Sequence, residues 1–248
     1  MSEPITISAC LIVRDEERHL PGCLDSLRPV VDEIVVVDTG STDGTVKAAR
    51  AGGARVIRQD WTDDFSAARN IALEEAVGDW ILVLDADERL EWKDHAAFRE
   101  PLATDDRWGC LLTLVNLLET QTSEVLLLRL FKNHPAVRYS GIIHESVESA
   151  LVKVAGDFER AVGRHPARII HTGYQPERRA EKGKDERDIR LLKKQISADP
   201  GTPYSWYKFA AHPYARQHLR PDVEKALWTA WALVQEKDPS GTIFSYTP

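Results

Sequence analysis

The sequence predicts an α/β protein with a Rossmann-like, mixed but mostly parallel sheet, flanked by helices and followed by a helical C-terminal part. Three observations support this fold class. Over residues 1–90, short apolar runs alternate with segments whose apolar residues have helical spacing. The run at residues 34–37 is wholly apolar and β-branched, which is typical of a parallel strand covered on both faces. Beyond residue 176 the chain is densely charged, with apolar residues again at helical spacing.

The first part of the chain is expected to contain four strands that alternate with helices. The strands are predicted at residues 5–13, 33–37, 54–57 and 80–84. The first helix lies in a segment opened by residues 14–17, with Leu20, Leu24 and Leu27 at helical spacing; the second is capped within residues 39–44 and ends at residues 52–53, and the third spans residues 66–78. Such units form a doubly wound sheet with right-handed crossovers, and its ligands bind beyond the carboxyl ends of the strands. We therefore expect a binding crevice at that edge.

The remaining elements are predicted from shorter patterns. A helix is expected at residues 92–102, a strand hairpin at residues 109–118 and 124–131, a loop at residues 155–166, and a short strand at residues 168–171. The C-terminal part is predicted to contain three helices. The first is amphipathic and lies in the charged segment that begins at residue 177, with Ile189, Leu192 and Ile196 at helical spacing, and the second spans residues 203–218 with a kink at Pro213. The third is expected to carry one buried apolar stripe, formed by Val223, Ala226, Leu227, Ala230, Trp231 and Val234. These helices are expected to form an antiparallel helical hairpin.

The composition excludes several classes of protein. Apolar residues make up 43% and charged residues 29% of the 248 residues, which is ordinary for a globular chain. A net charge of −7 argues against nucleic acid as a partner, because there is no basic surplus to displace counterions. We expect a cytoplasmic protein without a transmembrane segment, and leave peripheral membrane contact open. Cys10, Cys23 and Cys110 lack metal-site spacing and are expected to be reduced packing residues.

Three acids follow the apolar run at residues 80–84. Asp85 and Asp87 stand two positions apart in an extended segment, so their side chains point to the same side, and Glu88 is expected to support them. Hard oxygen ligands so placed suit Mg²⁺ or Mn²⁺ bridged to a diphosphate. The alternative is a solvated acidic turn. Asp38, at the end of another predicted strand, favours the binding site because both strand ends face one crevice.

Two further residues are candidates for nucleotide contacts. Asp38 can accept hydrogen bonds from a nucleobase N–H or a ribose hydroxyl, although it also suits an ordinary strand-to-helix turn. Arg69, in the first turns of a predicted helix, can pair with a phosphate or a base carbonyl. Its alternative is a surface ion pair with Asp63 or Asp64.

Histidines follow two Ile-Ile doublets, at His144 and at His171, and Glu145 comes next to the first of them. Histidine and carboxylate side chains serve as metal ligands or as proton acceptors where the fold holds them in place. Structural roles for both histidines are the alternative. The predicted topology brings them near Asp87.

These segments together resemble the family 2 glycosyltransferases of the GT-A fold. The resemblance extends from about residue 5 to residue 174 and is carried by the segments Val-Val-Asp-Thr-Gly-Ser-Thr-Asp-Gly-Thr (36–45), Ala-Arg-Asn (68–70), Asp-Ala-Asp-Glu (85–88), Arg-Leu-Phe-Lys-Asn (129–133) and Gly-Ile-Ile-His-Glu (141–145). It implies a GT-A domain at residues 1–174, with a nucleotide-sugar-binding half at 1–104 and an acceptor and metal-completing half at 105–174. Residues 175–248 are expected to form a helical extension, which resembles the start of tetratricopeptide-like helices.

The resemblance also implies roles for the nucleotide pocket. Asp38 is expected to contact the base. Arg14, Glu16 and Arg69 are expected to line the pocket, and Asp85 to approach the ribose or the metal.

The resemblance also implies roles in metal binding and catalysis for the acidic turn and the two histidines. Asp87 is expected to ligate Mg²⁺ or Mn²⁺, with Asp85 beside it and His171 completing the site. Glu145 stands where the catalytic carboxylate of the family falls. Because the family pattern there ends in Glu-Asp, whereas this chain has His144 before Glu145, His144 is expected to share or take over a role.

The function predicted from these residues is inverting, metal-dependent transfer of a sugar from a nucleoside diphosphate sugar, expected to be UDP-linked, to an acceptor hydroxyl. The acceptor is expected to be a glycan, lipid-linked molecule or protein, with envelope glycan synthesis as the family-level expectation. One alternative is a non-catalytic sugar-nucleotide-binding scaffold. Another is a nucleotidyltransferase, which usually carries a glycine-rich loop after its first strand, a loop that residues 14–17 lack.

Overall fold

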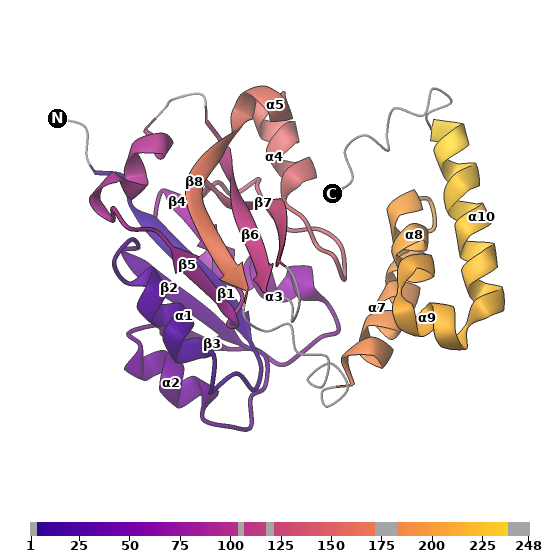
Figure 1. Cartoon of the computed structure of the whole chain (residues 1–248), viewed down its shortest axis with the longest axis horizontal. Coiled ribbons are helices and arrows are strands. Elements are labelled where there is room, and N and C mark those ends of the chain that lie inside the picture. The colour runs from indigo at the N-terminus through magenta and orange to yellow at the C-terminus, as the bar shows by residue number, and fades with distance from the viewer. Residues whose placement is uncertain (1–3, 104–106, 118–121, 172–182, 238–248) are drawn as a thin grey trace. The chain divides into compact units, whose positions relative to one another are not determined.

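The computed structural model describes residues 4–103, 107–117, 122–171 and 183–237. The chain divides into two compact units (Figure 1). The first contains residues 1–62, 66–140 and 146–174, and the second contains residues 63–65, 141–145 and 175–248. The boundary predicted at 174/175 and the turn predicted at residues 119–123 fall largely outside the described residues.

The first unit is built on one mixed sheet of eight strands in the order β3-β2-β1-β4-β7-β6-β8-β5. The strands are β1 (Ile7–Val13), β2 (Glu33–Asp38), β3 (Arg55–Arg58), β4 (Trp80–Val83), β5 (Glu88–Glu91), β6 (Gly109–Leu117), β7 (Thr122–Lys132) and β8 (Val162–His171). Strands β3, β2, β1 and β4 run parallel, and β7 pairs antiparallel with both β4 and β6. This architecture confirms the predicted α/β sheet flanked by helices.

Helices cover both faces of this sheet because the central strands carry apolar side chains on both sides. The helices are α1 (Leu20–Leu27), α2 (Thr45–Ala51), α3 (Phe65–Glu75), α4 (Glu148–Ala155) and α5 (Phe158–Ala161), with a 3₁₀-helix at Ala96–Leu102. One core cluster joins α1, α2 and the 3₁₀-helix to alternate residues of β1, such as Leu11. The other joins α3 and α4 to the opposite face, through residues such as Cys10 and Val83. The parallel strands are thereby buried from both sides.

One expectation for this unit was wrong, and one strand was not predicted. Residues 155–166, expected as a loop, contain the end of α4, all of α5 and the first half of β8. Strand β5 was not expected at all. Both strands depend on pairing between distant segments, since β8 lies between β6 and β5. Strand β8 was not predicted in full because some of its buried residues are polar. His165 is 3% exposed, and its Nε2 lies 2.9 Å from the Phe98 carbonyl oxygen.

The second unit contains four described helices, α7 (Lys184–Ala198), α8 (Pro203–Ala211), α9 (Pro213–His218) and α10 (Arg220–Lys237). They confirm the predicted helical C-terminal part. Pro213 separates α8 from α9 rather than kinking one helix, and His212 Nδ1 accepts the Tyr214 N–H at the start of α9. Ala226, Ala230 and Val234 of the predicted apolar stripe are buried on α10.

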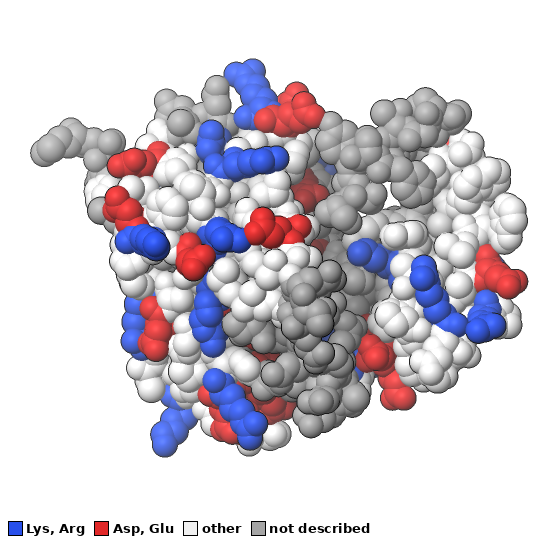
Figure 2. Space-filling model, in the orientation of Figure 1, with Lys and Arg blue, Asp and Glu red and all other residues white. Residues whose placement is uncertain are grey.

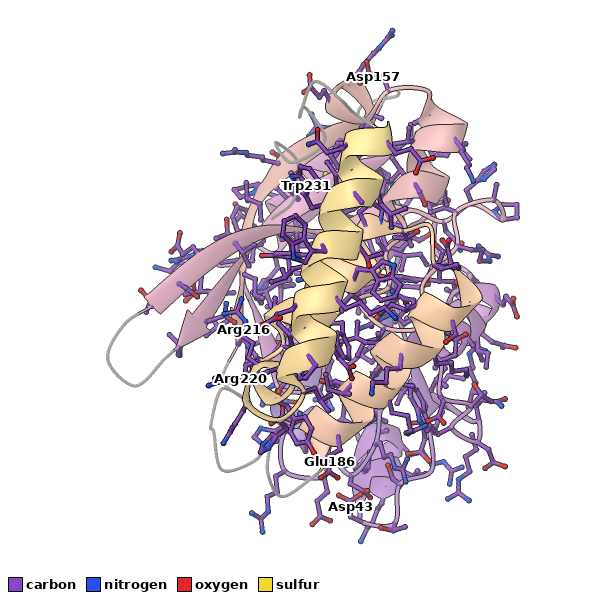
Figure 3. All side chains as sticks on the ribbon, turned by 90° about the vertical axis from the view of Figure 1, so that its right-hand side faces the viewer. Asp43, Asp157, Glu186, Arg216, Arg220 and Trp231 are labelled. Carbon is purple, nitrogen blue, oxygen red and sulfur yellow. The ribbon has the colours of Figure 1, made fainter. Side chains whose placement is uncertain are left out.

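Two other residues of that stripe face solvent. Leu227 is 45% exposed and Trp231, which stands on α10 in Figure 3, is 56% exposed. On the face shown in Figure 2, lysine and arginine side chains are interspersed with acidic ones. In the described part of the chain, no helix is both long and apolar enough to cross a membrane.

Candidate functional site

The sheet brings Asp38 and the acidic turn after β4 to one edge. Strand β1 lies between β2 and β4, with Val13 in register with Asp38 and Cys10 in register with Val83. Asp85 follows Val83 by two residues, so both acids stand at the carboxyl ends of the two parallel strands that flank β1. This is the edge at which open α/β sheets bind their ligands.

Asp38 lies under a loop that holds it in place. Its side chain is among the buried polar groups, with the residue 3% exposed, and both carboxylate oxygens lie 3.3 Å from the Ser41 N–H. Ser41 Oγ in turn accepts the Asp15 N–H at 2.9 Å. Asp15 has a φ of 53° and accepts the Thr42 N–H at 2.7 Å. The loops after β1 and β2 therefore interlock around Asp38.

Further hydrogen bonds continue this interlocking. Glu17 Oε2 accepts the Gly44 N–H at 2.8 Å, and the Glu16 N–H donates to Thr45 Oγ1 at 2.7 Å. Glu16, a predicted pocket residue, is thus bound through its backbone to the start of α2. Arg14, the other predicted residue of this loop, follows β1 directly and is exposed.

Asp85 lies between two arginines. Arg69 Nη2 donates to Asp85 Oδ1 at 3.0 Å, and Arg129 Nη2 lies 3.5 Å from Asp85 Oδ2. The same nitrogen of Arg129 donates to Glu88 Oε1 at 2.8 Å, while Glu88 Oε2 accepts the Asp85 N–H at 2.8 Å. The side chain of Asp85 is 40% exposed, whereas those of Arg69 and Arg129 are 11% and 12% exposed. The two cations are therefore held against an accessible carboxylate.

The two acids of this network differ in their electrostatics. Burial raises the pKa of Glu88 to about 7, an effect that Arg129 opposes and Asp85 reinforces. Burial also raises the pKa of Asp85, but the guanidinium groups of Arg69 and Arg129 outweigh it and hold that pKa well below its usual range. Asp85 is consequently ionised at neutral pH.

Asp87 and His171 face one another across the end of the sheet. Strand β5 pairs with β8 so that Glu88 is in register with His171, and His171 Nε2 lies 3.3 Å from Asp87 Oδ2. On its other side, His171 Nδ1 lies 2.8 Å from Asn116 Oδ1. Because an amide oxygen only accepts, Nδ1 carries the hydrogen, and Nε2 is left to face the carboxylate. The hydrogen bond that the protonated ring of His171 donates to Asp87 raises the pKa of His171.

This pair fits a divalent cation that keeps most of its ligands from substrate and water. Among the residues that the structure describes, no group of three or more His, Cys, Asp or Glu side chains could hold a metal ion. Mg²⁺ is commonly bound through one or two carboxylates together with substrate phosphates. A histidine whose second nitrogen is fixed by an acceptor is also the usual arrangement of a metal ligand. Asp85, engaged by arginines, stays a prediction as a third ligand.

The segment Gly141–Glu145 belongs to the second unit and is described with the helices. His144 has a φ of 55°, in the left-handed region, and its ring packs edge-on to Tyr204 with centroids 6.3 Å apart. Burial, and then the charge of Lys208, lower the pKa of His144. Glu145 is half-buried. His144 is thus neutral at pH 7, a state in which it can accept a proton.

The structure adds residues to the site for which the sequence predicted no role, and it changes the predicted partner of one residue. Arg129 lies on β7 within an apolar run, and a single charge in such a run signals a buried ion pair. Asn116 was missed because its partner, His171, is 55 residues away. Arg69 was considered as a partner of Asp63 or Asp64. The structure pairs it with Asp85, whereas Asp63 binds Arg190 within the second unit.

A family model matches the N-terminal part of the chain. Residues 8–103, which contain Asp38, Arg69, Asp85 and Asp87, match the family model described as glycosyl transferase family 2. The chain carries a glycosyltransferase family 2 domain. Both loops that interlock around Asp38, and the acidic turn after β4, lie within this domain.

Relatives extend the similarity over most of the chain. A TPR repeat-containing protein of Synechococcus elongatus is 40% identical over 203 residues, which are 80% of this chain and 50% of that protein. Glycosyltransferase SunS of Bacillus phage SPbeta is 26% identical over 231 residues, which are 91% of this chain and 52% of that protein. The chain thus spans about half the length of these curated relatives.

A solved structure supports the fold of the family 2 domain. The mannosyltransferase PcManGT from Pyrobaculum calidifontis, in complex with GDP-Man and Mn²⁺, superposes with a TM-score of 0.54 at 16% identity. The match covers 97% of this chain and 77% of that one. The fold is accordingly the GT-A fold.

Proposed function

We propose that this chain transfers a sugar from a nucleoside diphosphate sugar to an acceptor hydroxyl, with inversion at the anomeric carbon. The observation that carries the proposal is the group of charged side chains at the carboxyl edge of the sheet. There, Arg69 and Arg129 hold the ionised Asp85, and Asp87 faces His171. Asp38, at the end of β2 on the other side of β1, offers a buried acceptor to a base or ribose.

In this proposal Asp87 and His171 hold Mg²⁺ or Mn²⁺. The bound cation would neutralise the charge that develops on the diphosphate leaving group. Arg69 adds a guanidinium at the same edge, which suits phosphate or base oxygens. The base of the nucleotide is expected to be uracil, although the mannosyltransferase of similar fold holds GDP-Man, so both nucleotides belong in the test.

Proton removal from the acceptor is assigned to the Gly141–Glu145 segment. Glu145 takes the proton of the attacking hydroxyl in this proposal, a role worth about 10²–10⁴-fold in rate. His144 is the second candidate, because its lowered pKa keeps it neutral. The acceptor class, a glycan, lipid-linked molecule or protein, and a role in envelope glycan synthesis are proposals from the family resemblance alone.

A donor screen tests the proposal. Thermal shifts with UDP- and GDP-sugars in the presence of Mn²⁺ identify the nucleotide, since a ligand at 100 times its dissociation constant stabilises the folded state by about 2.7 kcal/mol. Release of nucleoside diphosphate from the best donor then measures turnover. We expect Asp87→Ala to lower turnover by about 10²-fold or more. Glu91→Ala, which removes an exposed acid of β5, is the control and should leave turnover unchanged.

Two results would contradict the proposal. Metal-dependent turnover that survives in Asp87→Ala would remove that residue from the metal site. Binding of nucleotide with Mn²⁺ but no hydrolysis or transfer, across donors and acceptors, would favour the non-catalytic scaffold.

A further inference from the structure

The segment that carries His144 and Glu145 is a short loop with fixed ends. Ser140 and Ser146, on either side of it, form an antiparallel bridge in which each N–H donates to the other carbonyl oxygen at 3.0 Å. Within the loop, Gly141 has a φ of 99° and His144 a φ of 55°. A left-handed histidine persists only where its surroundings impose that conformation. The loop therefore needs a partner that holds its middle.

Gln195 of α7 is that partner. Its Oε1 accepts the Ile143 N–H at 3.0 Å, and its Nε2 donates to Ser205 Oγ at 2.9 Å. A backbone N–H only donates, so the amide oxygen must face Ile143, and this settles the orientation of the side chain. Ser205 is 1% exposed and lies on α8. Both ends of the Gln195 amide are thus fixed.

The helix that carries Gln195 is itself well anchored. Leu192 and Ile196, one helical turn before Gln195 and next to it, are 0% and 9% exposed in the packed interior of the second unit. Gly141 lies close as well, since a Cβ added there would stand 3.4 Å from Gln195 Oε1. The loop is consequently packed tightly against this one side chain.

We propose that Gln195 is a positioning residue, which holds the Gly141–Glu145 segment in the conformation needed for proton transfer at Glu145 or His144. The inference rests on the proposed function and extends it to the helical part of the chain. It makes α7 a component of the catalytic machinery rather than an appended helix. A small displacement of a catalytic group can cost about 10²-fold in rate.

Hydrogen exchange at the Ile143 amide tests the hydrogen bond directly. Exchange of the loop is compared by NMR or mass spectrometry in the whole chain, for wild type, Gln195→Ala and Gln195→Glu. We expect exchange about tenfold faster in Gln195→Ala, because one hydrogen bond is lost. Gln195→Glu keeps an oxygen acceptor for Ile143 and should exchange like wild type. Gln235→Ala, at an exposed glutamine of α10, is the matched control.

Steady-state transfer supplies the second measurement. In Gln195→Ala we expect kcat to fall about 10–100-fold while KM for the donor is unchanged, and Gln195→Glu to recover most of the loss. Ser205→Ala, which removes only the far partner of the amide, should give a smaller change in the same direction. If circular dichroism shows that Gln195→Ala does not fold, the Ser205→Ala variant takes its place in the test.

The outcomes separate this inference from the proposed function. Unchanged Ile143 exchange in Gln195→Ala would overturn the positioning role, and so would faster exchange with an unchanged kcat. A wild-type protein that transfers no sugar would contradict the proposed function instead, and the exchange rates would still decide whether Gln195 holds the loop.

Discussion

Arg129 Nη2 lies 2.8 Å from Glu88 Oε1, and the two side chains are 12% and 3% exposed. The pair joins β7 to the start of β5, two segments that are 41 residues apart in the chain. A buried ion pair of this kind costs desolvation when it forms, but it costs more to break, because one charge is then left without a counterion. Asp85 depends on the same arginine.

Loss of Arg129 is therefore expected to destabilise the fold strongly. We expect Arg129→Met to lower the free energy of unfolding by about 3–5 kcal/mol, measured by urea denaturation. Adding Glu88→Gln should restore part of the loss, since the uncompensated buried charge is removed. Arg28→Met breaks the exposed pair with Asp25 and, as the control, should cost at most about 1 kcal/mol. Equal effects of the two arginine substitutions would contradict the buried network.

Asn116 is expected to tune metal binding through His171. Asn116→Leu removes the acceptor at Nδ1 and should weaken Mn²⁺ binding about 10–100-fold, as is usual for the partners that orient metal ligands. Asn116→Asp keeps an oxygen acceptor and should bind Mn²⁺ like wild type. Calorimetric titration of Mn²⁺ with the nucleoside diphosphate present measures the affinity. Equal affinity in Asn116→Leu would show that His171 does not ligate the metal.

Asp15 is expected to maintain the loop that covers Asp38. Its left-handed conformation suits asparagine as well as aspartate, and an asparagine oxygen can still accept the Thr42 N–H. Asp15→Ala loses that hydrogen bond and is strained, so it should lower the free energy of unfolding by about 1–2 kcal/mol and weaken donor binding. Asp15→Asn should be close to wild type. Thermal unfolding with and without nucleotide distinguishes the two variants.

The three cysteines are expected to resist alkylation in the folded protein. Burial raises the pKa of Cys10 to about 12 and also raises the pKa values of Cys23 and Cys110. Only the thiolate reacts, so at pH 8 about 10⁻⁴ of Cys10 is reactive. Iodoacetamide followed by mass spectrometry should label none of the three in native protein and all three in guanidinium chloride. Rapid labelling of any one in the native state would place it outside the core.

The elements predicted well are those whose signal is local. The wholly apolar run of β2 indicates a strand that is buried on both faces. The spacing of Leu20, Leu24 and Leu27 indicates that α1 is a helix buried on one face. Strand β8 has no such local pattern. One of its buried residues is the polar His165, whose ring forms a hydrogen bond with the distant Phe98. The local pattern there resembles a loop.

The sequence by itself determined the α/β fold class, the helical C-terminal part and the placing of Asp38 and Asp85 at the ends of two strands. These follow from periodicity and from the rule that parallel strands end at one edge. Only the tertiary structure decided which charge faces which: Arg69 with Asp85, Arg129 with Glu88, His171 between Asp87 and Asn116. Such pairs depend on strand order and register, which are set by contacts between segments far apart in the chain, and no local pattern of residues records them.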